Sequence, residues 1–152
     1  MRSIPIRHAI EQIIAVTPEM TVDFEQNEPG LGKLHPVYAT YWLTKHFELA
    51  SRKLVLPYLD DDEESIGFEV QVKHLASTLP GMNVRIVSQH RTTKDNRIYI
   101  DCEAFNELGD KIAEGSTTQV VLARKRLVQK FAELRERWEA QIGTKRPNEP
   151  DG

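Results

Sequence analysis

A segment bounded by two prolines constrains the fold of this chain more than any other feature. Between Pro36 and Pro57 the apolar residues do not alternate with polar ones but form a broad helical stripe: Trp42, Leu43, Phe47, Leu49, Ala50 and Leu54. Proline lacks the backbone N–H that a helix needs, so Pro57 should end the helix. We therefore expect one long, heavily buried helix over about 41–56.

Four segments after this helix alternate between apolar and polar residues, as strands of a half-buried sheet do. They cover about 66–74, 84–93, 98–104 and 113–123, and turn residues separate them. In the first segment Ile66, Phe68, Val70 and Val72 share one face with His74. Another strand is predicted ahead of the helix, over Thr17–Gln26. This order predicts an α+β fold, in which an antiparallel sheet wraps around one long central helix.

The two ends of the chain have different patterns. Residues 1–16 are predicted to form an N-terminal arm or short helix, since Ile10, Ile13 and Ile14 have helical spacing. With 152 residues the chain fits a single domain, which we place at 17–126. An amphipathic pattern from Arg124 onward predicts an extra C-terminal helix, of which 127–141 lie beyond the domain. The polar remainder, 142–152, is predicted to be disordered.

Composition limits the classes of partner and compartment. The formal net charge of −3 argues against nucleic-acid binding. A single cysteine, Cys102, cannot form an internal disulfide, and no signal peptide or membrane span is evident, so we expect a cytoplasmic protein. The acidic run 60–64 lacks the ligand spacing of a calcium loop, and the histidines have no metal-site spacing, so no metal is expected. Cys102 shares the parity of Ile100 and Ala104 and is interpreted as a core residue.

Thr40, Glu48 and His74 follow one another at spacings of eight and twenty-six residues. From His74 to Gly81 the chain reads His-x-Ala-x-Thr-x-Pro-Gly, and Gly67 precedes this stretch. These features resemble the fluoroacetyl-CoA thioesterase family of hotdog proteins, which has a threonine, a glutamate and a histidine at the same spacings and the same His-x-Ala-x-Thr-x-Pro-Gly stretch. The resemblance covers roughly 17–126.

The resemblance implies a hotdog fold, a homodimer, an acyl-CoA substrate and hydrolysis by Thr40, Glu48 and His74, with no cofactor. It implies that Gly67 lines the acyl pocket. Gln119 stands where the family has an arginine in its last strand, and a neutral amide cannot supply that charge. We therefore expect a short or medium acyl group other than fluoroacetyl, with Gln119 among the substrate-binding residues.

The residue types agree with this chemistry and leave the roles open. A hydroxyl is a weak nucleophile that needs a nearby base, and histidine is the side chain whose ordinary pKa lies closest to 7. Thr40 either attacks the carbonyl or positions water, and Glu48 is either nucleophile or base. Each residue also has a purely structural interpretation: Thr40 as a helix N-cap, Glu48 as a solvated helix residue, His74 as a core histidine, and Gly67 as a bulge or close backbone approach.

Helix geometry adds a constraint on the site. Eight residues of ideal helix rise about 12 Å, so Thr40 and Glu48 cannot touch within one straight helix. Either Thr40 lies on a bent approach to the helix, or the site is completed across a dimer interface, which we favour. Whether dimers pair into tetramers does not follow from the sequence.

Two other functions fit the same fold. A hotdog module can bind acyl-CoA or another small ligand without cleaving it, since fold alone does not fix function. A hydratase or dehydratase fits least well, because no aspartate follows His74 within its strand.

Overall fold

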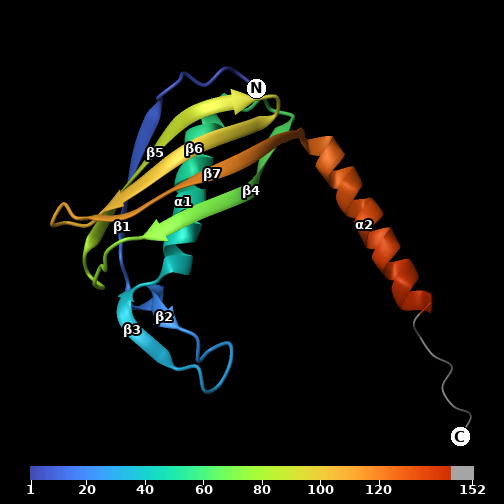
Figure 1. Ribbon diagram of the computed structural model, residues 1–152. Coiled ribbons are helices and arrows are strands. Elements are labelled where there is room, and N and C mark those ends of the chain that lie inside the picture. Colours follow the sequence, from blue (N-terminus) through green and yellow to red (C-terminus); the bar gives the residue numbers. More distant parts are fainter. Residues whose placement is uncertain (145–152) are drawn as a thin grey trace, which may run out of the picture.

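A twisted five-stranded sheet covers one face of a long helix in this computed structural model, which describes residues 1–144 (Figure 1). The main sheet has the order β1-β5-β6-β7-β4, every pair antiparallel, and β2 and β3 form a separate ribbon. The elements are β1 (Ala9–Ala15), β2 (Thr21–Asp23), β3 (Lys33–Tyr38), α1 (Thr40–Val55), β4 (Glu63–His74), β5 (Asn83–Lys94), β6 (Arg97–Phe105), β7 (Lys111–Ala123) and α2 (Arg124–Thr144). The predicted α+β architecture is confirmed.

The central helix α1 forms where the apolar stripe predicted it. Leu43, Phe47 and Leu54 recur at helical spacing and are almost fully buried against the sheet. The helix passes at Val55 into a short 3₁₀ turn, Leu56–Tyr58, which contains Pro57. Because α1 lies along the sheet, it fixes the positions of the side chains that project from its other faces.

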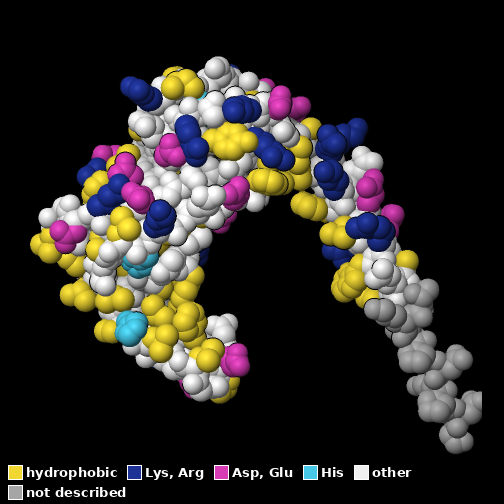
Figure 2. Space-filling model, in the orientation of Figure 1, with side chains coloured by type: hydrophobic (Ala, Val, Ile, Leu, Met, Phe, Trp, Pro, Cys, Tyr) yellow, Lys and Arg dark blue, Asp and Glu magenta, His cyan; other side chains and the backbone are white. Residues whose placement is uncertain are grey.

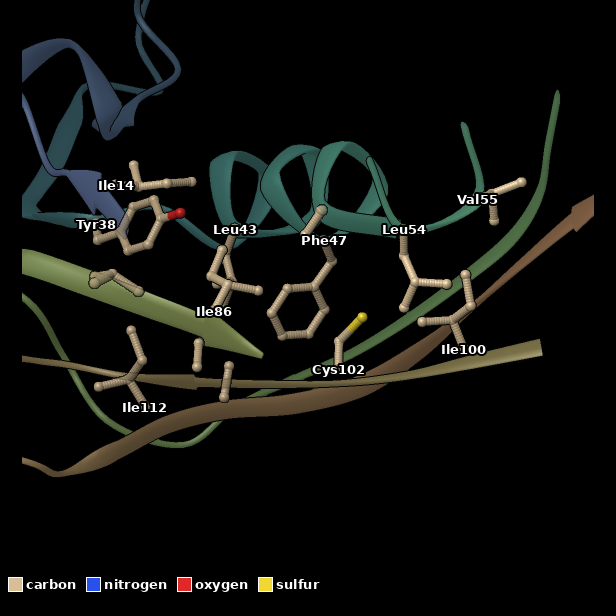
Figure 3. Packing of buried hydrophobic residues seen from close by; sticks show 14 of the residues in the cluster. Ile14, Tyr38, Leu43, Phe47, Leu54, Val55, Ile86, Ile100, Cys102 and Ile112 are labelled. Carbon is tan, nitrogen blue, oxygen red and sulfur yellow. The ribbon is translucent and has the colours of Figure 1, made fainter. Parts of the chain in front are cut away.

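The core lies between α1 and the inner face of the sheet (Figure 3). Leu43 and Phe47 point from α1 toward Ile86 of β5 and Cys102 of β6, and Leu54 packs near Ile100. Full burial of one such side chain stabilises the fold by about 1.5–3 kcal/mol relative to exposure. This packing holds α1 rigidly on the strands that carry the remaining site residues.

Ile100→Val should lower the free energy of unfolding by about 0.5–1.5 kcal/mol, because it removes one methylene from a fully buried position. The matched control is Ile13→Val on β1, where the side chain is 60% exposed. Urea unfolding of both variants measures the difference. Equal losses at the two positions would contradict the core described above.

The N-terminal predictions are wrong in two places. The predicted arm or helix over 1–16 contains β1, which pairs with β5 at the edge of the main sheet. Ile10, Gln12 and Ile14 alternate toward the core there, whereas Ile13 points to solvent. The strand predicted over Thr17–Gln26 is confined to Thr21–Asp23, because Pro18 begins a 3₁₀ turn ahead of it. That strand belongs to the ribbon.

The predicted C-terminal helix is confirmed as α2, which follows β7 directly and stands away from the sheet (Figures 1 and 2). Leu127 is its one buried residue among those described, and five large apolar side chains are exposed: Val128, Phe131, Leu134, Trp138 and Ile142. The helix continues to Thr144, three residues into the segment predicted to be disordered. The rest of that segment, 145–152, lies outside the described residues. No helix in the described part of the chain is long and apolar enough to cross a membrane.

Candidate active site

Thr40 and His74 meet where the start of α1 lies beside the end of β4. Thr40 Oγ1 is 2.9 Å from His74 Nδ1. The sequence allowed Thr40 to be the N-cap of the helix, but the N-cap is Ala39 and Thr40 is the first helical residue. Because the Thr40 hydroxyl is not used for capping, it is available to pair with the imidazole.

His74 has one nitrogen paired and one free of partners. Its Nε2 is buried and has no hydrogen-bond partner within the described structure. Burial lowers the pKa of the His74 imidazole below its ordinary value of 6.5, and a backbone interaction with Ala76 opposes that shift. A cavity of about 370 Å³ adjoins the pair, and it is lined by Val22, His35, Val37, Tyr38, Thr40, His74, Leu75, Ala76 and Ser77. The imidazole is therefore neutral at pH 7 and borders an open space.

Glu48 lies two turns further along α1, in a second cavity. This space of about 280 Å³ is lined by Glu48, Leu49, Arg52, Ser65, Gly67 and Gln119. Glu48 Oε1 is 2.8 Å from the point that a Cβ on Gly67 would occupy. The absent side chain of Gly67 thus makes room for the Glu48 carboxylate, and whether this cavity takes the acyl group stays a prediction.

A β-bulge in β4 brings Gly67 to the inner face. The register with β7 shifts between Gly67 and Glu69, so that Phe68 has no partner opposite it. The prediction that Ile66 and Phe68 share a face with Val70 is therefore wrong: both are exposed, and the Phe68 ring lies 4.4 Å from the Arg97 guanidinium. Without the bulge, Gly67 would face solvent.

The structure assembles the predicted site residues in two groups. Thr40 and His74 are in contact, and Glu48, Gly67 and Gln119 share the other cavity. Within one chain the groups are separate, because Thr40 and Glu48 are eight residues apart on one helix, a rise of about 12 Å. The alternative of a bent approach is wrong, since Thr40 is already helical.

Two neighbours of the second cavity were not singled out from the sequence. Arg52 follows Glu48 by four residues, so it lies on the same face of α1, and Ser65 precedes Gly67 by two residues on the same face of β4. Arg52 Nη1 donates to Ser65 Oγ at 2.7 Å, and Ser65 Oγ donates to Gln119 Oε1 at 2.7 Å. The helical period of four residues from Glu48 would have indicated Arg52, and the strand period of two residues from Gly67 would have indicated Ser65.

His46, His90 and the cysteine are built into the fold. His46 is hydrogen-bonded to the Tyr38 hydroxyl, and His90 is hydrogen-bonded to the Pro5 carbonyl and to Thr93. Cys102 is buried as predicted, and burial raises the pKa of its thiol to about 11. Within residues the structure describes, no three His, Cys, Asp or Glu side chains are grouped to hold a metal ion.

Comparison with known proteins decides the family. Residues 16–125 match the family described as fluoroacetyl-CoA-specific thioesterase. The chain belongs to this family. Membership confirms the resemblance found in the sequence, the hotdog fold and the assignment of the chain to the acyl-CoA thioesterases.

Relatives of this thioesterase family agree with the match. The chain is 29% identical over 108 residues to the fluoroacetyl-CoA thioesterase of Streptantibioticus cattleyicolor, covering 70% of this chain and 77% of that protein. A Thermus thermophilus hypothetical protein described as a thioesterase superfamily member is 53% identical, with a TM-score of 0.87 over 92% of this chain and 99% of that one. A mutant fluoroacetyl-CoA-specific thioesterase in complex with fluoroacetate and CoA is 24% identical and has a TM-score of 0.76, over 82% and 99% of the two chains.

Proposed function

We propose that this protein hydrolyses the thioester of a short or medium acyl-CoA at a site made of Thr40, Glu48 and His74, completed across a homodimer. The observation that carries the proposal is the contact of 2.9 Å between Thr40 Oγ1 and His74 Nδ1 beside an open cavity. A hydroxyl paired with a neutral imidazole is the arrangement that activates an oxygen nucleophile. Family membership supplies the thioester class.

The chemistry assigns His74 the proton transfers. The oxygen of the attacking group adds to the thioester carbonyl carbon while His74, neutral because of its lowered pKa, accepts the proton. The C–S bond then breaks, and the proton passes to the departing CoA thiolate. The net reaction consumes one water and yields a carboxylic acid and free CoA. Thr40 either attacks or holds the water, and Glu48 either attacks or acts as base. If Thr40 or Glu48 attacks, the acyl group is first transferred to that oxygen, and a water molecule then hydrolyses the acyl-enzyme to the acid; the Glu48 carboxylate has no proton to give, so in that case His74 accepts the proton of the water in the second step.

The free edge of β4 supports a two-chain site. β4 is the outermost strand of the main sheet, and its unpaired backbone groups can bind another strand (Figure 1). If two β4 strands pair antiparallel about Gln71, Gly67 lies opposite the partner's His74, because the bulge at Phe68 removes one residue from the register. Glu48, which lies over Gly67, would then face the Thr40 and His74 pair of the other chain.

Helix α2 gives a second copy of this protein an additional surface to contact. Its exposed apolar row lies beyond the end of β7, on the side of the sheet that ends in β4 (Figures 1 and 2). The helix carries six basic and three acidic side chains, whereas residues 1–123 carry 12 basic and 18 acidic ones. Opposite net charges favour contact between α2 of one chain and the body of the other.

Thiol release from a panel of acyl-CoA esters tests the proposed reaction. The thioesterase should release free CoA from short or medium acyl groups at a rate that depends on His74. The alternative from the sequence, a module that binds acyl-CoA without cleaving it, predicts binding in calorimetry with no thiol release from any ester. That result would replace the catalytic interpretation by the binding one.

Gly67→Ala tests the position of Glu48. The added Cβ would lie 2.8 Å from Glu48 Oε1, which is the end of a flexible side chain, so the carboxylate can move aside. We expect the free energy of unfolding to change by less than about 1 kcal/mol. The displaced carboxylate should lower kcat about tenfold or more, since misplacement by about 1 Å costs up to 10²-fold.

Steady-state kinetics with urea unfolding separates the two effects in Gly67→Ala. The matched control is Gly143→Ala near the end of α2, where an added Cβ meets no atom within 4 Å. Unchanged kcat in the Gly67→Ala variant would show that Glu48 needs no fixed position.

A further inference from the structure

A chain of hydrogen bonds leads from the surface of α1 into the Glu48 cavity. Arg52 Nη1 donates to both the carbonyl oxygen and the Oγ of Ser65, at 2.7 Å each. Ser65 Oγ lies 2.7 Å from Gln119 Oε1. Ser65 and Gln119 are both buried, with 6% and 5% of their surfaces exposed, so water does not compete with these contacts.

The chemistry of Arg52, the first donor, fixes the direction of these hydrogen bonds. A guanidinium only donates, so Ser65 Oγ must accept from Arg52. The one hydroxyl hydrogen of Ser65 then needs an acceptor, and the neighbouring oxygen of Gln119 is in reach. A reversed amide would leave that buried hydrogen unpaired, which costs about 1–3 kcal/mol. The oxygen of the Gln119 amide therefore faces Ser65, which leaves the NH₂ as the end of the amide that can donate into the cavity that Gln119 lines.

Glu64 holds Arg52, the first residue in this series of hydrogen bonds. Arg52 Nη2 donates to Glu64 Oε1 at 2.5 Å, and both side chains are about one-third exposed. The hydrogen bond from Arg52 holds the pKa of the Glu64 carboxyl below its ordinary value, so the carboxylate stays charged at neutral pH. The guanidinium is thus held on both sides, by Glu64 and by Ser65.

We propose that Arg52 and Ser65 position the Gln119 carboxamide so that its NH₂ donates to the thioester carbonyl oxygen. This inference rests on the proposed function, and it makes Gln119 a catalytic residue and the other two positioning residues. Every acyl-CoA carries this carbonyl oxygen beside the bond that breaks, and a short acyl chain offers no other acceptor. The arrangement replaces the charge of an arginine by an oriented neutral donor.

The donor matters most at the tetrahedral stage. When an oxygen nucleophile adds to the carbonyl carbon, the C=O π pair moves onto the oxygen, which becomes negative. A donor already aimed at that oxygen needs no reorganisation. When the pair returns, the C–S bond breaks and CoA leaves as the thiolate. The interaction is therefore stronger in the transition state than with the bound ester, and its loss should lower kcat more than it changes KM.

Gln119→Glu is the first test. The carboxylate still accepts from Ser65 but presents an oxygen to the cavity in place of NH₂. Removal of one donor to an oxyanion lowers kcat about 10²–10³-fold, and we expect a loss of that size with KM little changed. Because protonation restores a donor, the activity of this variant relative to that of the wild type at the same pH should rise as the pH falls.

Ser65→Ala and Arg52→Met test the positioning. Each frees the amide to turn, so kcat should fall about tenfold, the effect of one hydrogen bond. Arg52→Lys keeps a donor to Ser65 and should retain most of the activity, which a loss of packing alone would not predict. Thermal unfolding of each variant shows whether the protein remains folded at the assay temperature.

The outcomes separate this inference from the function on which it rests. Wild-type kcat in Gln119→Glu or in Ser65→Ala would overturn the donor chain and leave the hydrolase standing. A wild-type protein that releases no thiol from any acyl-CoA would overturn both. The expected pattern, a loss in kcat that Arg52→Lys avoids, supports the chain.

Discussion

An equal mixture of Glu48→Gln and His74→Ala dimers should recover about a quarter of the wild-type rate after subunit exchange, although each variant alone is nearly inactive. The structure places Thr40 and His74 in one group and Glu48 in another. If each site takes one group from each chain, a mixed dimer has one site with both substitutions and one site with neither. Half of the dimers are mixed, and half of their sites are intact.

The matched control for the mixture uses Thr40→Ala with His74→Ala. These residues touch within one chain, so both sites of that mixed dimer lack one member of the pair. No activity should return on exchange. Recovery in the control, or none in the Glu48→Gln and His74→Ala mixture, would contradict the shared site. Thiol release before and after exchange in mild denaturant measures both results.

The sequence predicted the central helix well because its signal is local. The stripe with Phe47 and Leu54 has the period of a helix, and Pro57 marks its end, so no long-range information was needed. The contact between Thr40 and His74 was predicted by a family spacing, and the structure brings the two side chains together. Their catalytic roles remain predictions.

Features that depend on pairing between strands were not predicted. The sequence alternates between apolar and polar residues across the bulge at Phe68, but the bulge reverses which residues face inward on its two sides. The bulge is defined by the register of β4 with β7, and the sequence of β4 alone does not show it. β1 was missed because Gln12 takes an inward position between Ile10 and Ile14, so the helical spacing of the isoleucines looked stronger. The donor chain through Arg52 and Ser65 joins three elements, and residue spacing within each one does not reveal the connection.

His74→Ala should lower kcat/KM about 10²–10⁴-fold, the usual contribution of a positioned acid–base group. Because burial lowers the pKa of His74 below 6.5, the imidazole of the wild type is neutral and able to accept a proton at pH 7. The wild-type kcat/KM should therefore be flat near neutrality and fall tenfold per pH unit only below that lowered pKa. The residual activity of His74→Ala should lack this acid limb.

The matched control for His74→Ala is His8→Ala, since the His8 ring packs on Tyr58 at the far end of the molecule from the Thr40 cavity.

The lowered pKa of His74 also links pH to stability: between the folded and unfolded pKa values the unfolded chain binds a proton that the folded chain does not. The contribution of His74 to the free energy of unfolding is therefore complete above pH 6.5, the ordinary pKa of histidine. It declines as the pH falls from 6.5 toward the lower pKa of His74 in the folded protein. A His74→Ala profile with the wild-type acid limb would assign that limb to another group and remove His74 from the proton transfer.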